Sequence, residues 1–146
     1  MSARGSARLT TALATAAATL ALGLAVGARP LARAADDDPA VKVASKPEVG
    51  SYLTDGAGRT LYLFKKDTQG KSACAGSCVT LWPVFYRERV QPAAGTRSTD
   101  FGTITREDGK KQTTYKGLPL YYFSGDHAPS DTKGQGFKDL WVVASP

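Results

Sequence analysis

The chain has 146 residues, a length that accommodates one domain and argues against two domains of full size. Of its nineteen basic side chains, four lie in residues 1–34, where there is no acidic residue. The rest of the chain contains the other fifteen basic side chains and all thirteen acidic side chains, a balance too even for an electrostatic nucleic-acid interface. Composition therefore excludes an obvious DNA-binding protein, a disordered chain and a polytopic membrane protein.

The N-terminal segment has the order of features that is typical of an export signal. Residues 1–11 carry two arginines, residues 12–28 are almost wholly apolar, and Ala32-Arg33-Ala34 follows with small residues at the two positions that a signal peptidase reads. An uncleaved anchor is the alternative, but a stretch of seventeen residues rich in Ala and Thr is short for a membrane span. The sequence therefore predicts a signal peptide over residues 1–34, cleavage before Ala35, and no membrane span in the mature protein.

A short acidic segment separates this signal from the rest of the chain. Residues 35–40 contain three consecutive aspartates followed by Pro39, and such a run cannot bury apolar surface. We expect residues 35–40 to be a solvated leader and residues 41–146 to form a single domain.

The chain repeats itself at a constant offset of 59 residues, which indicates an internal duplication. We predict a first repeat over residues 41–86, a linker over 87–99 and a second repeat over 100–145. The match needs no gap, and neither repeat is long enough to be stable alone, so the two should share one core. The matching pairs are Thr54 with Thr113, Gly58 with Gly117, Leu61 with Leu120, Tyr62 with Tyr121, Phe64 with Phe123, Asp67 with Asp126, and Leu81-Trp82 with Leu140-Trp141.

The predicted elements are almost all strands. Residues 61–64 and 120–123 are apolar at every position, so these two strands should be central and covered on both faces. One helical turn is expected near residues 75–80. The fold class predicted is all-β, a small sandwich or barrel built from two pseudo-symmetric β-meander repeats, with Trp82 and Trp141 in equivalent buried positions. The expected strands are 41–44, 52–54, 61–64, 81–85, 101–106, 112–115, 118–123 and 140–143.

Two aspartates follow the central strands. Asp67 and Asp126 each stand where a short acidic side chain can accept backbone N–H bonds of the next loop and fix its turn. The alternative makes them ligands of a cation, with Asp131 as a third, but the spacing fits no EF-hand loop. Tyr62 and Tyr121 are interpreted as core aromatic residues rather than redox relays.

Cys74 and Cys78 are the only cysteines, and export would place them in an oxidising compartment. Their even number and close spacing favour a disulfide. The alternative is a copper site, because two cysteines four residues apart with a distant histidine supply soft ligands for Cu(I). His127, the sole histidine, would be the third ligand.

The doubled aromatic block resembles a bacterial secreted-repeat family of predicted lipoproteins, whose recurring signature is Y-x-[FWY]-x-x-D. Residues 62–67 and 121–126 both fit that signature, and Cys74-Ala75-Gly76-Ser77-Cys78 with Trp82-Pro83 is similar to its C-x-G-x-C and W-P pattern. The resemblance implies export, with no assigned reaction. No cysteine lies near the predicted cleavage site, so a lipid anchor would have no acceptor.

The function predicted is an exported, non-catalytic repeat domain of the bacterial cell envelope or extracellular space, acting by binding or as structure. We expect no cofactor, an envelope or extracellular partner, and no nucleic acid. The alternative is a periplasmic or extracellular copper-binding or thiol-redox protein that uses Cys74, Cys78 and His127. The chain has no G-x-S-x-G, C-x-x-C-H or H-E-x-x-H motif, and so gives no support to the corresponding enzyme or haem classes.

Overall fold

The structure is a computed structural model that describes Asp38 and residues 40–146. The predicted signal peptide and most of the acidic leader lie outside the described residues. Asp38, expected in the solvated leader, is half-buried, and its backbone oxygen accepts a hydrogen bond from Nε of Arg87 at 2.9 Å. The folded part therefore includes the last aspartate of the leader.

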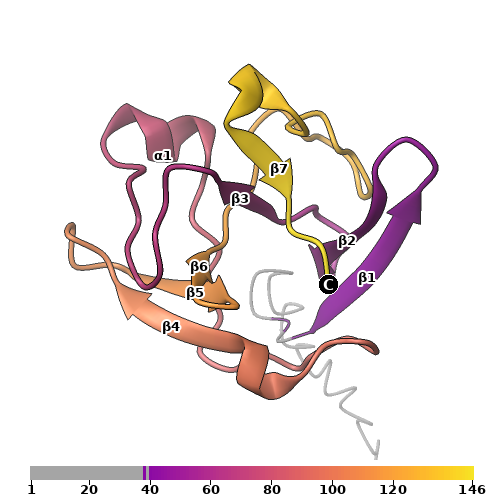
Figure 1. The fold of residues 1–146 in the computed structure, drawn as a ribbon, viewed down its shortest axis with the longest axis horizontal. Coiled ribbons are helices and arrows are strands. Elements are labelled where there is room, and N and C mark those ends of the chain that lie inside the picture. Colours follow the sequence, from indigo (N-terminus) through magenta and orange to yellow (C-terminus); the bar gives the residue numbers. More distant parts are fainter. Residues whose placement is uncertain (1–37, 39) are drawn as a thin grey trace, which may run out of the picture. The chain divides into compact units, whose positions relative to one another are not determined.

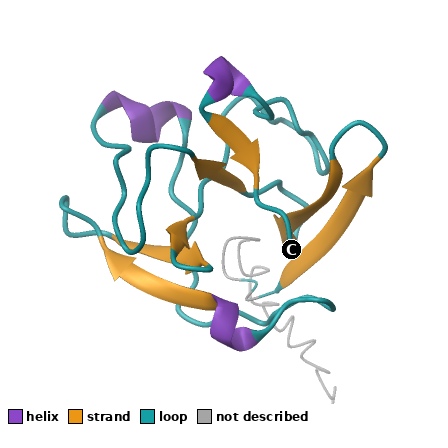
Figure 2. Cartoon of the chain, viewed as in Figure 1, coloured by secondary structure: helices purple, strands orange, loops and turns teal. Residues whose placement is uncertain are grey.

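The fold is all-β, as the sequence predicted, with strands in three small antiparallel sheets (Figures 1 and 2). The only α-helix among the described residues is the short α1 (Ser77–Leu81), and two 3-10 turns cover Ser98–Asp100 and Phe137–Asp139. No helix in residues 40–146 is long and apolar enough to span a membrane. The sheets pair β1 (Val41–Lys46) with β2 (Gly50–Asp55), β3 (Tyr62–Phe64) with β7 (Trp141–Val143), and β4 (Phe101–Thr105) with β5 (Lys111–Tyr115) and β6 (Leu118–Pro119).

The two hairpins are equivalent, but at an offset of 60 residues rather than 59. Val41 pairs with Asp55 in the first hairpin, and Phe101 pairs with Tyr115 in the second. The predicted gapless register is therefore wrong for the hairpins. The reason lies in the turns, because Lys116 and Gly117 form a two-residue turn with positive φ at both positions, whereas the turn after Asp55 is longer.

The central segments around Tyr62 and Tyr121 are related by a pseudo-twofold axis. The backbone N–H of each tyrosine donates to the backbone oxygen of the other, at 2.8 and 3.0 Å. The N–H of Phe85 donates to the backbone oxygen of Leu120, and the N–H of Ala144 donates to that of Leu61. The flanking hydrogen bonds therefore repeat at the offset of 59. The two repeats are thus joined by antiparallel backbone pairing.

Both faces of these central segments are covered, as predicted. Side chains at alternate positions enter two different hydrophobic clusters, which is the period of two expected of an extended strand. Each cluster draws on both repeats. One holds Val41, Leu53, Leu61, Phe85, Tyr115, Leu120, Tyr122 and Ala144, and the other holds Tyr52, Tyr62, Cys74, Trp82, Tyr121, Phe123, Trp141 and Val143.

The predicted strand over residues 81–85 does not form. Leu81 is the last residue of α1, and the N–H of Trp82 donates to the Cys78 carbonyl at 2.8 Å, which continues the helical turn. Pro83 has no N–H to donate to a ladder, so only Val84 makes an isolated bridge, to Tyr121. The equivalent segment of the second repeat has no proline, and it forms β7.

Candidate functional site

The tyrosines and aspartates of the doubled signature meet across the pseudo-twofold axis. Tyr62 donates from its hydroxyl to Oδ2 of Asp126 at 2.6 Å, and Tyr121 donates to Oδ2 of Asp67 at 2.7 Å. The tyrosine of each repeat therefore binds the aspartate of the other repeat. The signature residues form a reciprocal lock between the two halves of the domain.

The second carboxylate oxygen of each aspartate holds the loop that follows. Oδ1 of Asp67 accepts the N–H of Ala73 at 2.6 Å, and Oδ1 of Asp126 accepts the N–H of Lys133 at 2.9 Å. This is the turn-fixing role that the sequence suggested. Each carboxylate thus connects its own loop to the tyrosine of the other repeat.

Four aromatic rings stack through the same region in the order Phe64, Trp141, Trp82, Phe123. Successive ring centroids lie 4.3, 3.7 and 4.4 Å apart, and the two indole planes differ by 3°. The signature phenylalanine of each repeat therefore stacks on the tryptophan of the other. Both tryptophans are buried at equivalent positions, as predicted, but that they stack on each other was not foreseen.

Burial governs the ionisation of the lock. It raises the pKa of Asp67 and of Asp126 above the ordinary 3.8, against the lowering effect of the N–H and hydroxyl donors. Burial also raises the pKa of Tyr62 and Tyr121 far above the ordinary value of 10.0, and the neighbouring carboxylates add to this. The tyrosines are therefore held as neutral donors.

The raised pKa values predict the pH dependence of the lock. Folded Asp67 and Asp126 keep their protons to higher pH than the unfolded chain does, so their contribution to stability is fully present below about pH 3.8 and is lost as pH rises through the raised values. Denaturant unfolding from about pH 3 to about pH 7 should compare wild type with Asp67→Asn/Asp126→Asn. The stability of wild type relative to the variant should fall as pH rises, and a relative stability that rises with pH would contradict the assignment.

Cys74 and Cys78 form a disulfide, as predicted, with their Cα atoms 5.4 Å apart. Cys74 is buried in the cluster around the tryptophans, and Cys78 packs at its edge. A bridge that closes so short a loop stabilises by only about 2 kcal/mol on the chain-entropy model. The disulfide therefore fixes the loop before α1 and does not link the two repeats.

His127 does not join the cysteines. It is exposed in the loop after Asp126, and its backbone N–H donates to the Asp131 carboxylate at 2.9 Å. Within the described part of the chain, no three His, Cys, Asp or Glu side chains are grouped so as to hold a metal ion. The structure thus brings together neither Cys74, Cys78 and His127, the ligands of the alternative copper site, nor the three aspartates of the alternative cation site.

Comparison with protein-family models gives two matches, over residues 43–86 and 102–145. Both are to a family described as a secreted repeat of unknown function, and each match covers most of one structural repeat. The chain belongs to this family. Neither the curated proteins nor the solved structures that were searched contain a significant match.

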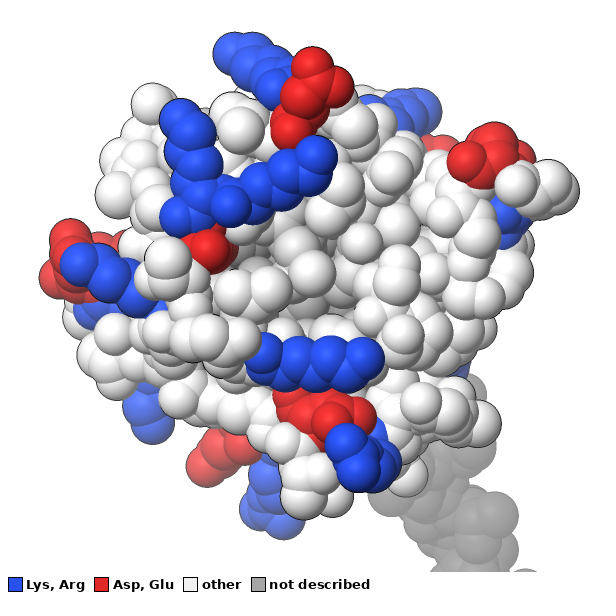
Figure 3. All heavy atoms as spheres, in the orientation of Figure 1, with Lys and Arg blue, Asp and Glu red and all other residues white. Residues whose placement is uncertain are grey.

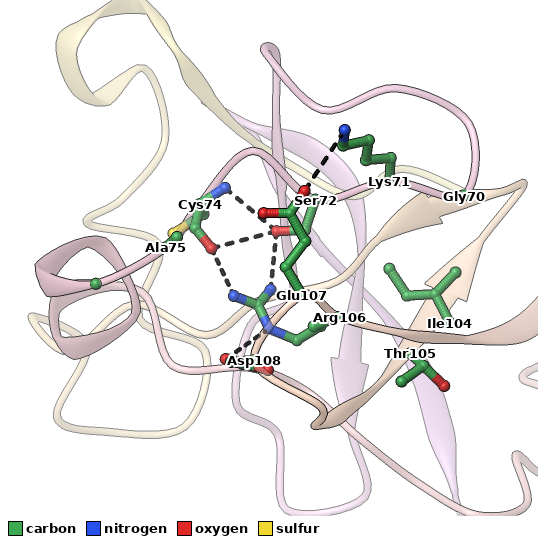
Figure 4. Close-up of a pocket in the computed structure, with 11 residues that line it drawn as sticks. Gly70, Lys71, Ser72, Cys74, Ala75, Ile104, Thr105, Arg106, Glu107 and Asp108 are labelled. Carbon is green, nitrogen blue, oxygen red and sulfur yellow. Dashed lines mark hydrogen bonds and ion pairs between the residues drawn. The ribbon is translucent and has the colours of Figure 1, made fainter.

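In this secreted repeat, the buried Arg106 connects the β4–β5 turn to the loop before α1 (Figure 4). Arg106 donates to Oγ of Ser72 at 2.8 Å, to Oε1 of Gln112 at 2.6 Å and to the Cys74 carbonyl, and Oγ of Ser72 hydrogen-bonds the Tyr121 hydroxyl at 2.6 Å. The guanidinium lies beside a pocket of about 100 Å³. Sequence reasoning missed this residue, because the hairpin register places Lys46 at the equivalent position and so gives no repeated arginine.

A second buried polar group lies at the turn after β2. Asp55 accepts the N–H groups of Ala57 and Arg59 at Oδ1, and its Oδ2 accepts the Tyr122 hydroxyl at 2.8 Å. Nη2 of Arg87 lies 3.7 Å from the same Oδ2. The sequence placed Asp55 between the expected strands 52–54 and 61–64 but assigned Arg87 to the linker, since nothing in its spacing indicates that a charged residue is buried there.

Proposed function

We propose that this chain is an exported, non-catalytic module that acts at the bacterial cell envelope or outside the cell, by binding or as structure. The observation that carries the proposal is the reciprocal lock. Its tyrosines and aspartates define the family signature. Their side chains hydrogen-bond each other and the backbone of neighbouring loops. Groups held in this way serve the architecture of the domain.

Three further observations support the proposal. The family is described as secreted, which agrees with the signal-peptide pattern of residues 1–34. The disulfide suits an oxidising compartment. On the face shown in Figure 3, basic and acidic side chains are interspersed with uncharged surface, which gives this face no extended single-sign surface for nucleic acid.

Mass spectrometry of the exported protein tests this proposal and separates it from the copper and thiol-redox alternative. The full chain should be produced in a bacterial host, and its intact mass measured with and without alkylation, together with its metal content. We expect a product that begins at Ala35, takes up alkylating agent at Cys74 and Cys78 only after reduction, and holds no stoichiometric copper. Retention of Met1 on a membrane-bound product, or copper that is lost on His127→Ala, would contradict the proposal.

A further inference from the structure

The two repeats differ at one backbone position beside the lock, and this difference coincides with a pocket. Val84 and Val143 are equivalent, because Val84 bridges Tyr121 and Val143 pairs with Tyr62. In the second repeat the N–H of Val143 donates to Oε1 of Gln135 at 2.8 Å. That side-chain carbonyl therefore covers the outer edge of β7.

The first repeat has no such cover. Phe85 directs its N–H to Leu120 and accepts at its carbonyl from Thr113, so the neighbouring N–H of Val84 points to the opposite side of the extended segment. The residues that correspond to Gln135 are Ala75 and Gly76, whose side chains have no acceptor. Within the part of the chain that the structure describes, the Val84 N–H has no hydrogen-bond partner.

A pocket of about 390 Å³ lies against this segment. That volume is within the range of small-molecule sites and too small for a folded partner. The lining combines side chains of α1 and of residues 83–86 with residues of the β4–β5 turn and the start of β5. Its lining residues are Val79, Pro83, Val84, Tyr86, Asp108, Lys110 and Lys111.

The charged side chains of the pocket favour an anion. Lys110 and Lys111 are exposed, and neither forms an ion pair within residues 40–146. The single acid, Asp108, already accepts from the N–H of Lys110 and lies 3.3 Å from Nε of the buried Arg106. The pocket thus carries two ammonium groups against one carboxylate, that of Asp108, which is shared between Lys110 and the buried Arg106.

We propose that this pocket binds the carboxylate of a small apolar or aromatic molecule. One carboxylate oxygen accepts the N–H of Val84, as the side-chain carbonyl of Gln135 accepts the N–H of Val143. The ammonium groups of Lys110 and Lys111 bind the negative charge. The apolar group of the ligand packs on Val79, Pro83 and Tyr86. The site deepens the proposed binding role and rests on it, since it names the chemical class of ligand for a module without a reaction.

Titration of the disulfide-bonded protein with N-acetyl-L-phenylalanine, followed by ¹H–¹⁵N NMR, tests the site. We expect saturable shifts at the amides of Val84, Tyr86, Lys110 and Lys111, with no comparable shift at Val143. N-acetyl-L-phenylalaninamide, which has the same apolar group and no charge, should bind about tenfold more weakly. Equal binding of the acid and the amide, or shifts confined to other regions, would overturn the proposal.

Two variants separate the site from a general charge effect. Lys110→Gln/Lys111→Gln should weaken binding about tenfold, whereas Lys65→Gln/Lys66→Gln, which removes the same charge from other exposed positions, should leave it unchanged. Val84→Pro removes the N–H, replaces the valine side chain by the proline ring and fixes φ, and should also weaken binding. Equal losses of affinity in both lysine variants would overturn the proposed site. The proposed function is tested separately, because the N-terminus at Ala35 and the disulfide are measured independently of this titration.

Discussion

Replacing Trp82 by alanine is expected to lower the free energy of unfolding by about 3–5 kcal/mol. Trp82 is 2% exposed, stacks on Trp141 at 3.7 Å and on Phe123 at 4.4 Å, and meets the ring of Tyr62 edge-on. Its removal opens a cavity in the middle of a four-ring stack and breaks contacts between the repeats as well as within one. Equilibrium denaturation in urea measures the loss.

The pseudo-twofold symmetry supplies a matched variant. Trp141→Ala removes the other inner ring of the stack and should cost a similar free energy, while Trp82→Phe, which keeps a ring in place, should cost less than either. Leu81 precedes Trp82 in the chain but is 39% exposed, so Leu81→Ala should change stability by only about 0.5 kcal/mol. A Trp82→Ala loss no larger than that of Leu81→Ala would contradict the central role of the stack.

Features that repeat in the sequence predicted much of the architecture. Uninterrupted apolar residues over 61–64 and 120–123 indicated central segments, and these supply alternate side chains to two clusters. The matching tryptophans indicated equivalent buried sites. The two cysteines indicated a bridge because their number, spacing and expected compartment all pointed the same way.

What the sequence could not supply was the partner of each repeated residue. A duplication predicts that Tyr62 and Tyr121 have equivalent surroundings, but it does not say whether each contacts Asp67 or Asp126. That choice depends on how the two halves face each other across the axis. Contacts without a counterpart, such as those of Arg106, give no repeat signal at all.

The one-residue shift between the two hairpins also could not be predicted from the sequence. Most of the identities at an offset of 59 lie in or next to the central segments, where aromatic side chains of both repeats pack together. The hairpins also carry identities at an offset of 59, such as Thr54 with Thr113, but their backbone pairing follows an offset of 60, which only the structure shows. Turns absorb the difference because their length is free to vary at the surface.

Asp55→Ala is expected to lower the free energy of unfolding by about 3–5 kcal/mol, although Asp55 lies outside the signature. Its carboxylate is fully buried and is the acceptor for two backbone N–H groups and for the Tyr122 hydroxyl. The buried guanidinium of Arg87 lies 3.7 Å away, and that of Arg59 stacks over the Tyr122 ring at 3.7 Å. Alanine would remove the acceptor of the two backbone N–H groups and of the Tyr122 hydroxyl.

An exposed ion pair provides the control for Asp55→Ala. Glu107 and Lys71 lie 3.5 Å apart with side chains 81% and 70% exposed, so Glu107→Ala should cost less than about 1 kcal/mol. Asp55→Asn, which keeps one acceptor oxygen and removes the charge, should fall between the two, because the backbone N–H groups stay bonded while the charge near Arg87 is lost. If Asp55→Ala and Glu107→Ala cost the same in urea unfolding, the turn after β2 does not depend on its buried carboxylate, and Arg87 must be held by its bonds to the Asp38 and Tyr86 carbonyls instead.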